Sequence, residues 1–291
     1  MAHTVKIDFY TVEMPNGAPE FRKLAIDDSK TADDETRNVI VGGYPVRLQN
    51  AHPSQGIVEA EMLRIQMSDL PAKAKLSGKV GNLDLDEDEG IGGETAFLYD
   101  TQHKVLVLQR NKSGVTANML SGYFQAKGGV APIVLRPVIQ ADAIKRLAAM
   151  KETRRLKVRL AGITNPAFFR SQGSGLGEMV DILEFFRAPS ATFEMSMGHQ
   201  SGSLWAQKIV ALAKKVVNLP TDNKGEVSTM EVSGILDDDS RDVFDVLAYR
   251  MVEIVQVATN EHRRSSYKKR RPEIKQAWER RKDELASMFG S

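Results

Sequence analysis

The stretch TAFLYDTQHKVLVLQR, residues 95–110, places two apolar runs on either side of a short connection. TAFLYD and KVLVLQR are rich in β-branched and aromatic residues, which is typical of strands. Residues 101–103 between them are too few for a crossover, so the two strands form a hairpin and run antiparallel. This stretch therefore predicts a largely antiparallel sheet.

Toward the N-terminus the sequence predicts further strands, separated by polar or glycine-rich loops. VKIDFYTVEM (5–14), NVIVGGYPVRLQN (38–50) and GIVEAEMLRIQM (56–67) have the composition of strands and partly alternate apolar with polar residues. SGKVGNLDLDEDEGIGGE (77–94) is rich in glycine and acid. We expect a loop there, with a domain boundary inside it.

Toward the C-terminus, strands and helices interleave irregularly. Helices are predicted at residues 114–129, 141–152, 176–188 and 203–219, and strands at 133–140, 154–164, 191–198 and 226–236. This order predicts an α+β fold with a mixed, largely antiparallel sheet, interleaved helices and a C-terminal basic helix. The expected segments are a strand-rich N-terminal region (1–92), an α+β core (93–262) and the basic helix (263–291).

RDVFDVLAYRMVEIVQVAT, residues 241–259, fits two structures. Its β-branched residues suit a strand. Its length favours a helix, and Val243, Leu247 and Met251 follow Ser240, a possible cap, at helical spacing. We expect a helix.

The composition limits the classes of protein that the chain can belong to. The 291 residues carry a net charge of +2 and contain no cysteine, which excludes disulfides and thiolate metal sites and favours a reducing compartment. The N-terminus lacks the basic and apolar regions of a signal peptide, and no apolar run approaches the roughly 20 residues that span a bilayer. We expect a cytoplasmic protein without membrane insertion.

Two motifs suggest chemistry that the sequence does not complete. Asp84, Asp86 and Asp88 alternate as in cation-binding loops, but the glycine and glutamate of an EF-hand are absent, so a solvated loop is favoured. GSGLGE (173–178) resembles part of a dinucleotide fingerprint, but Glu178 stands where the third glycine belongs. The five histidines show no metal-ligand spacing. We expect no cofactor, no metal and no catalytic residue.

RRSSYKKRRPEIKQAWERRKDEL, residues 263–285, holds ten lysines or arginines and four acids, all four of them after Pro272. Pro272 suits the first position of a helix. The helix then has one apolar stripe, which consists of Ile274, Ala277, Trp278, Leu285, Met288 and Phe289. We expect this helix to dock on the protein, with Trp278 packed rather than stacked on bases.

The cations before Pro272 are the candidate DNA-binding residues. Four of these cations, Lys268 to Arg271, directly precede the helix, where the helix dipole is positive. The dipole disfavours cations there, so the run indicates a polyanionic partner. A charged solvated loop is the alternative. The expected phosphate-contacting residues are Arg263, Arg264, Lys268, Lys269, Arg270 and Arg271.

A second basic surface is expected on the strand RRLKVRLAGI. Because strand side chains alternate, Arg155, Lys157 and Arg159 share one face. Three cations along one face repel each other unless phosphates or cross-strand acids cover them. The sequence does not decide between phosphates and cross-strand acids as the partners of these three cations.

Four segments of the chain carry a resemblance to a known family. They are residues 95–124, 133–140, 181–197 and 251–267. Their order resembles the phage-exclusion family of RexA from phage lambda and, more loosely, the B component of the Kiwa anti-phage system. The resemblance implies a cytoplasmic homodimer that binds double-stranded DNA without strong sequence preference and acts in phage defence. A second defence protein is a further expected partner. It supplies no catalytic residues.

The sequence leads to one main hypothesis and two alternatives. The main hypothesis is a non-enzymatic, sequence-independent DNA-binding protein of phage defence. One alternative is a metal-dependent nuclease or toxin that uses Asp84, Asp86 and Asp88. The other is a protein-interaction module with a basic tail. A homodimer is also expected from the amount of apolar surface at residues 243–258 and on the last helix.

Overall fold

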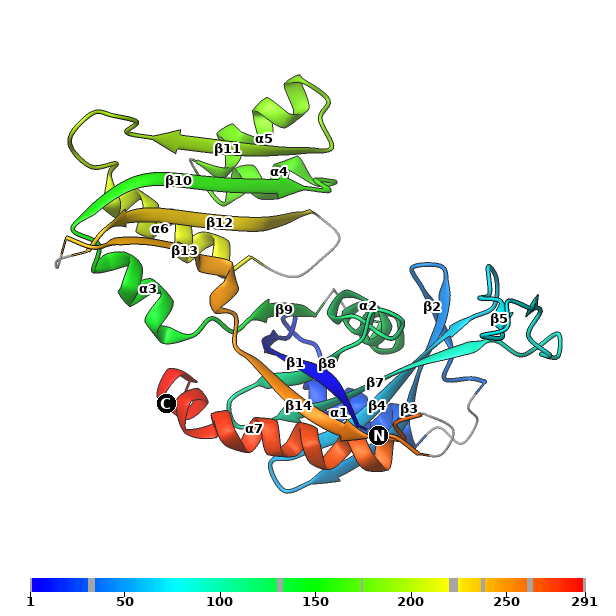
Figure 1. Ribbon diagram of the computed structural model, residues 1–291. Helices are drawn as coiled ribbons and strands as arrows, with labels where there is room; N and C mark the ends of the chain where they lie inside the picture. Colours follow the sequence, from blue (N-terminus) through cyan, green and yellow to red (C-terminus); the bar gives the residue numbers. More distant parts are fainter. Residues whose placement is uncertain are drawn as a thin grey trace. The chain divides into compact units, whose positions relative to one another are not determined.

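The computed structural model describes residues 2–30, 35–129, 133–173, 175–219, 225–236, 239–260 and 264–289 (Figure 1). The chain forms two compact units. Unit 1 combines the chain up to Leu135 with the chain from Val252 onward, and unit 2 is Arg136–Met251. The units therefore divide the chain differently from the segments 1–92, 93–262 and 263–291 expected from sequence.

Unit 1 is built on a sheet whose order is β14-β1-β8-β7-β4-β3-β2, with β9 also paired to β1. All neighbours along this path are antiparallel. The strands are β1 (Ala2–Glu13), β2 (Val39–Val41), β3 (Tyr44–Ser54), β4 (Ile57–Gln66), β7 (Ile91–Asp100), β8 (Val105–Arg110), β9 (Val134–Pro137) and β14 (Val252–Ala258). A small hairpin of β5 (Lys73–Ala74) and β6 (Val80–Gly81) lies between β4 and β7 in sequence.

The expected hairpin at residues 95–110 is confirmed as β7–β8, with Phe97 opposite Leu108. It contributes two neighbouring strands in the middle of the sheet. Buried residues of β4, β7 and β8 on one face pack against α1 (Phe21–Ser29) and α2 (Ala117–Gly128). The opposite face carries α7 (Tyr267–Phe289), and Figure 1 shows α2 and α7 on the two sides of the strands.

Two expectations about secondary structure are corrected. The single strand expected at residues 38–50 is the hairpin β2–β3, which turns at Gly42 and Gly43 in the left-handed region (φ 60° and 84°) that glycine adopts without strain. The helix expected at residues 241–259 is wrong. That segment forms β13 (Arg241–Asp245), a 3-10 turn η1 (Val246–Tyr249) and β14.

The reason for the second error is long-range pairing. Strand β14 lies beside β1 at the other end of the chain, with Val255 opposite Val5, and β13 pairs with β12 (Glu226–Ile235). β-branched side chains fit a pleated sheet, so pairing overrides the helical spacing of the apolar residues.

Unit 2 is a sheet of order β11-β10-β12-β13, again antiparallel, with β10 (Glu152–Ala161) and β11 (Ser190–Ser196). Its helices are α3 (Ala141–Ala148), α4 (Pro166–Ser171), α5 (Leu176–Phe185) and α6 (Ala206–Val217). Inward residues of β10, such as Leu156 and Val158, form one core with α4, α5 and α6. The two units together confirm the predicted α+β class, and none of the described helices is long and apolar enough to cross a membrane.

Candidate nucleic-acid interface

Helix α7 begins at Tyr267, so Lys268 to Arg271 form its first turn rather than a loop before it. The prediction that Pro272 starts the helix is wrong, because Pro272 lies inside it. The Ser266 carbonyl accepts hydrogen bonds from the backbone N–H of Lys269 (2.9 Å) and Arg270 (3.1 Å), which closes the turn upstream of the proline.

The docking role of α7 is confirmed. Its buried stripe contains Ile274, Ala277, Trp278 and Leu285. Met288 and Phe289, also expected in the stripe, are not buried: Met288 is half-buried and Phe289 is exposed. The Trp278 indole is buried and donates from Nε1 to the Asp100 carboxylate at 2.9 Å. Trp278 therefore packs against the sheet and is not available to stack on a base.

Beneath the start of α7, strands β4 and β7 present three carboxylates, Glu59, Glu61 and Glu94, which we call the acidic row. Glu59 and Glu61 are two residues apart on β4 and so point to the same face. They are almost fully buried, with 4% and 2% exposure. Buried carboxylates of this kind need cationic or hydrogen-bonding partners.

Three arginines supply those partners. Arg270, itself 5% exposed, donates to Glu61 and to Glu94, the latter at 2.9 Å. Arg271 donates to Glu59 at 2.6 Å, and Arg264 donates to Glu94. The charges of the acidic row are thus matched by three arginines. Arg264 lies in the short segment before α7 (residues 264–266, the arm), and Arg270 and Arg271 lie in the first turn of α7.

The pKa values of the acidic row and of its arginines depend on one another. Burial raises the pKa of Glu61, neighbouring Glu94 adds to the rise, and Arg270 opposes it. The hydrogen bond to Glu59 raises the pKa of Arg271. Four consecutive cations at a positive helix end are therefore partly explained by carboxylates within the same chain, without any polyanion.

The lysines of the same run behave differently from the arginines. Lys268, Lys269 and Lys275 are exposed. Neither Lys268 nor Lys275 pairs with a carboxylate among the described residues, and the Lys269 ammonium contacts only the Thr259 carbonyl, at 3.3 Å. Arg263, also expected to contact phosphates, lies outside the described residues.

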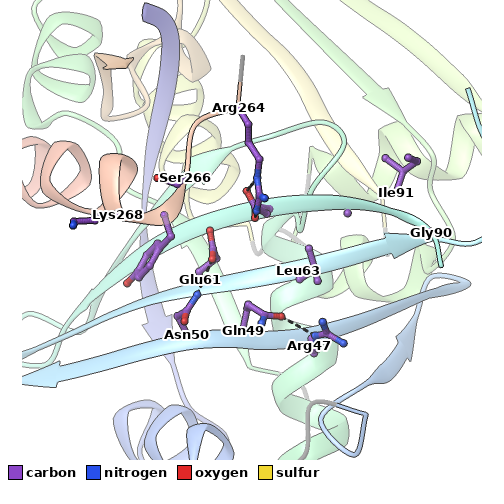
Figure 2. A pocket seen from close by; sticks show the side chains of 13 residues that line it. Arg47, Gln49, Asn50, Glu61, Leu63, Gly90, Ile91, Arg264, Ser266 and Lys268 are labelled. Carbon is purple, nitrogen blue, oxygen red and sulfur yellow. Dashed lines mark hydrogen bonds and ion pairs between the residues drawn. The ribbon is translucent and has the colours of Figure 1, made fainter. Parts of the chain in front are cut away.

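A hollow of about 720 Å³ opens beside the start of α7 (Figure 2). Its cations are Arg47, Arg264 and Lys268, and the Arg47 Nε donates to Gln49 at 2.8 Å. Burial, and then repulsion from Arg37, lower the pKa of Arg47. In Figure 2 the Arg264 side chain extends from the arm before α7 toward the sheet.

A second hollow of about 420 Å³ shares Tyr267 and Lys268 with the first. It adds Lys275 and His52, whose ring stacks on Tyr267 with centroids 5.7 Å apart. We call the two together the α7 hollow. Sequence reasoning missed Arg47, His52 and Lys275 as members of this site, because the first two lie more than 200 residues before α7 and no motif marks them.

An anchor of three side chains holds the middle of α7. The Asp100 carboxylate accepts from Trp278 and lies 2.7 Å from His103 Nδ1, and all three residues are buried. Burial alone would raise the pKa of Asp100, but the hydrogen bonds from His103 and Trp278 outweigh it and hold that pKa below its usual range. The anchor fixes α7 to the sheet independently of the acidic row.

The second predicted basic surface lies in unit 2, on the face of β10 opposite its helices. Arg155 pairs with Glu231 at 2.5 Å and with Glu194 at 3.7 Å. Lys157 stands between the same two glutamates in the strand register, and Arg159 is exposed. Cross-strand acids therefore neutralise part of the charge of Arg155, Lys157 and Arg159, which is one of the two alternatives expected from the sequence.

The two incomplete motifs have plain local roles. Asp84 pairs with Lys73 at 3.1 Å on an exposed surface, and no group of three or more potential metal ligands occurs among the residues that the structure describes. Glu178 accepts from the Gly175 backbone N–H and caps α5. Ser174 of the glycine-rich segment lies outside the described residues.

A sequence model of one protein family matches residues 5–284, which is nearly the whole chain. Its description is a family of unknown function, DUF6731. No curated protein matches the chain.

Proposed function

The chain belongs to the DUF6731 family, and we propose that it is a non-enzymatic protein that binds double-stranded DNA without sequence preference. The observation that carries this proposal is the separation of the basic run into two sets. Three arginines are occupied by the acidic row, whereas Lys268, Lys269 and Lys275 project from the same helix without carboxylate partners in the described part of the chain.

A phosphate backbone is the partner that suits these lysines. Lysine contacts phosphates as a flexible point charge, and each contact releases counterions from DNA. Lys268 and Lys269 lie in the first turn of α7, where the helix dipole also favours an anion. Such contacts position the duplex but carry no sequence information.

The biological setting is part of the same proposal and rests on the resemblance to the RexA and Kiwa families. We propose a homodimer that acts in phage defence together with a second defence protein. A dimer would present two α7 hollows to one duplex. Light scattering should then give twice the chain mass of 32.2 kDa at micromolar concentration, and a particle of one chain mass would contradict the dimer.

The test replaces Lys268, Lys269 and Lys275 together with glutamine and measures duplex affinity across a salt series. Each lost phosphate contact should lower the slope of log affinity against log salt by roughly 0.9, so the slope should flatten by about two to three units. Two unrelated duplexes should be affected equally, since the contacts read no bases.

The matched control replaces Lys73, Lys75 and Lys79, exposed lysines of the β5–β6 hairpin, with glutamine. It removes the same charge away from α7 and should leave the slope unchanged. Equal slopes for the α7 variant and the native protein would refute the proposal. Cleavage of plasmid with magnesium or manganese would favour the nuclease alternative, and loss of the gel shift with an acidic competitor protein would favour the interaction module.

A further inference from the structure

Unit 2 contains an apolar pocket that DNA binding does not use. Its volume is about 430 Å³, and its apolar wall includes Leu156, Met179, Met195, Trp205, Ile209 and Leu212. These residues lie on β10, α5, β11 and α6, except Trp205, which directly precedes α6. Both the volume and the apolar lining are typical of small-molecule sites, and the two methionines can adapt to a ligand's shape.

Two lysines line the same pocket. Lys208 and Lys215 are seven residues apart on α6, so they lie on one side of the helix, two turns from each other. Ala211 lines the pocket between them. Neither ammonium pairs with a carboxylate within the ranges that the structure describes.

Several arginines of the same unit have acidic partners. Arg146 pairs with Asp242, Arg155 pairs with Glu231, and Arg170 pairs with two acids of α5. Lys208 and Lys215 have no such partner among the described residues, which leaves positive charge at the edge of an apolar cavity.

Gly175, directly before α5, forms part of the wall, and Gly173 lies close to Lys215. Gly173 and Gly175 have φ values of 91° and 100°, which side-chain-bearing residues rarely adopt. A Cβ atom on Gly173 would lie 2.7 Å from the Lys215 ammonium, so the bare backbone lets that charge approach. The nearby Glu178 carboxylate is used in capping α5 and is not among the pocket residues.

We propose that this pocket binds a medium-chain acyl carboxylate. The alkyl tail would lie among the methionines and leucines, and the carboxylate would meet Lys208 or Lys215. A purely apolar ligand would leave both ammoniums unmatched, and a ligand of many charges would not suit the apolar wall. The complementary ligand therefore has one anionic end and one flexible apolar tail.

Decanoate is the probe, titrated into the full chain below its micelle concentration and followed by calorimetry. We expect saturable one-to-one binding. Lys208→Gln with Lys215→Gln should weaken decanoate binding about tenfold or more, while binding of 1-decanol, which has the same chain length and no charge, should be unchanged by that substitution. Octanoate should bind about tenfold or more weaker than decanoate, since each buried methylene contributes about fourfold.

Trp205 offers an independent readout, because it lines the pocket and is 76% exposed. Its emission should shift to the blue when decanoate covers it, and Trp205→Phe should lose that signal while the heat of binding persists. Ala211→Phe, at an exposed position of α6, should fill the pocket without disturbing the core and should abolish binding.

A circular dichroism melt should show that each variant is folded. Failure of the folded native protein to bind decanoate would overturn the proposal. Equal binding by the native, Ala211→Phe and double-lysine variants would also overturn it, since the ligand would then lie elsewhere. Because the pocket is in unit 2 and the α7 hollow is in unit 1, either proposal can fail while the other stands.

Discussion

The start of α7 and the face of β10 both carry closely spaced cations, yet they differ in what surrounds them. Arg270 in unit 1 has a side chain only 7% exposed, between the buried Glu61 and the half-buried Glu94. Arg155 in unit 2 has a side chain 38% exposed, beside two partly solvated glutamates. The same kind of sequence signal therefore marks a buried structural layer in one unit and a solvated surface in the other.

The comparison teaches that a basic run cannot be assigned from its own residues. The role of each cation depends on whether a carboxylate from a distant strand lies within ion-pairing distance. Removing one partner of a buried pair leaves a bare charge in the interior, whereas removing one partner of an exposed pair changes little because water replaces it.

The largest effect is expected for Arg270→Met. It leaves Glu61 and Glu94 short of their shared partner, so the free energy of unfolding should fall by about 3–5 kcal/mol in urea denaturation. Lys268→Met, two residues away and exposed, is the control and should change it by at most about 0.5 kcal/mol. Similar values for the two variants would break the distinction between buried arginines and exposed lysines.

A smaller effect is expected for Asp100→Asn, which tests the anchor under α7. Because the folded-state pKa of Asp100 is lowered from its ordinary value of 3.8, its charge stabilises the fold above about pH 4, and this contribution is lost as the pH falls through the folded-state pKa. At pH 7 the variant should lose about 1–3 kcal/mol of unfolding free energy. The deficit should shrink in urea denaturation below pH 4, and a deficit that grows there would contradict the assignment.

The smallest effect is expected on the open face of unit 2. Arg155→Gln, Lys157→Gln and Arg159→Gln together should leave the thermal midpoint unchanged, because the ion pairs of Arg155 are solvated. The salt dependence of duplex binding should flatten by about one unit or less, compared with two to three for the α7 lysines. An equal or larger flattening would show that the β10 face, and not the α7 hollow, is the main DNA-binding surface.

Local patterns predicted much of the fold. The hairpin at residues 95–110, the alternation along β10 and the apolar stripe of α7 are all determined by neighbours in sequence, and the structure confirms them. The segment 241–259 was misassigned because its apolar spacing fits a helix and a strand alike. Strand β1, which pairs with the β14 part of this segment, lies about 250 residues away, beyond the reach of any local pattern.

The candidate site was less predictable than the fold. The sequence pointed to the basic run, but the acidic row comes from β4 and β7, about 170 to 210 residues earlier. This row pairs with the arginines and, within the described residues, leaves the lysines without a carboxylate partner. No sequence motif around Glu59 and Glu61 predicts that they pair with arginines of α7. Only the folded sheet brings them together.

The pairing of β14 with β1 has a consequence for synthesis on the ribosome. β1 joins β8 once the first 110 residues have emerged, but its other edge stays without β14 until residue 258 is made. At roughly 5–20 residues per second, that interval is on the order of ten seconds to half a minute. An open strand edge is a template for wrong pairing, so the nascent chain passes through a period in which unit 2 can fold while unit 1 is still exposed to misassembly.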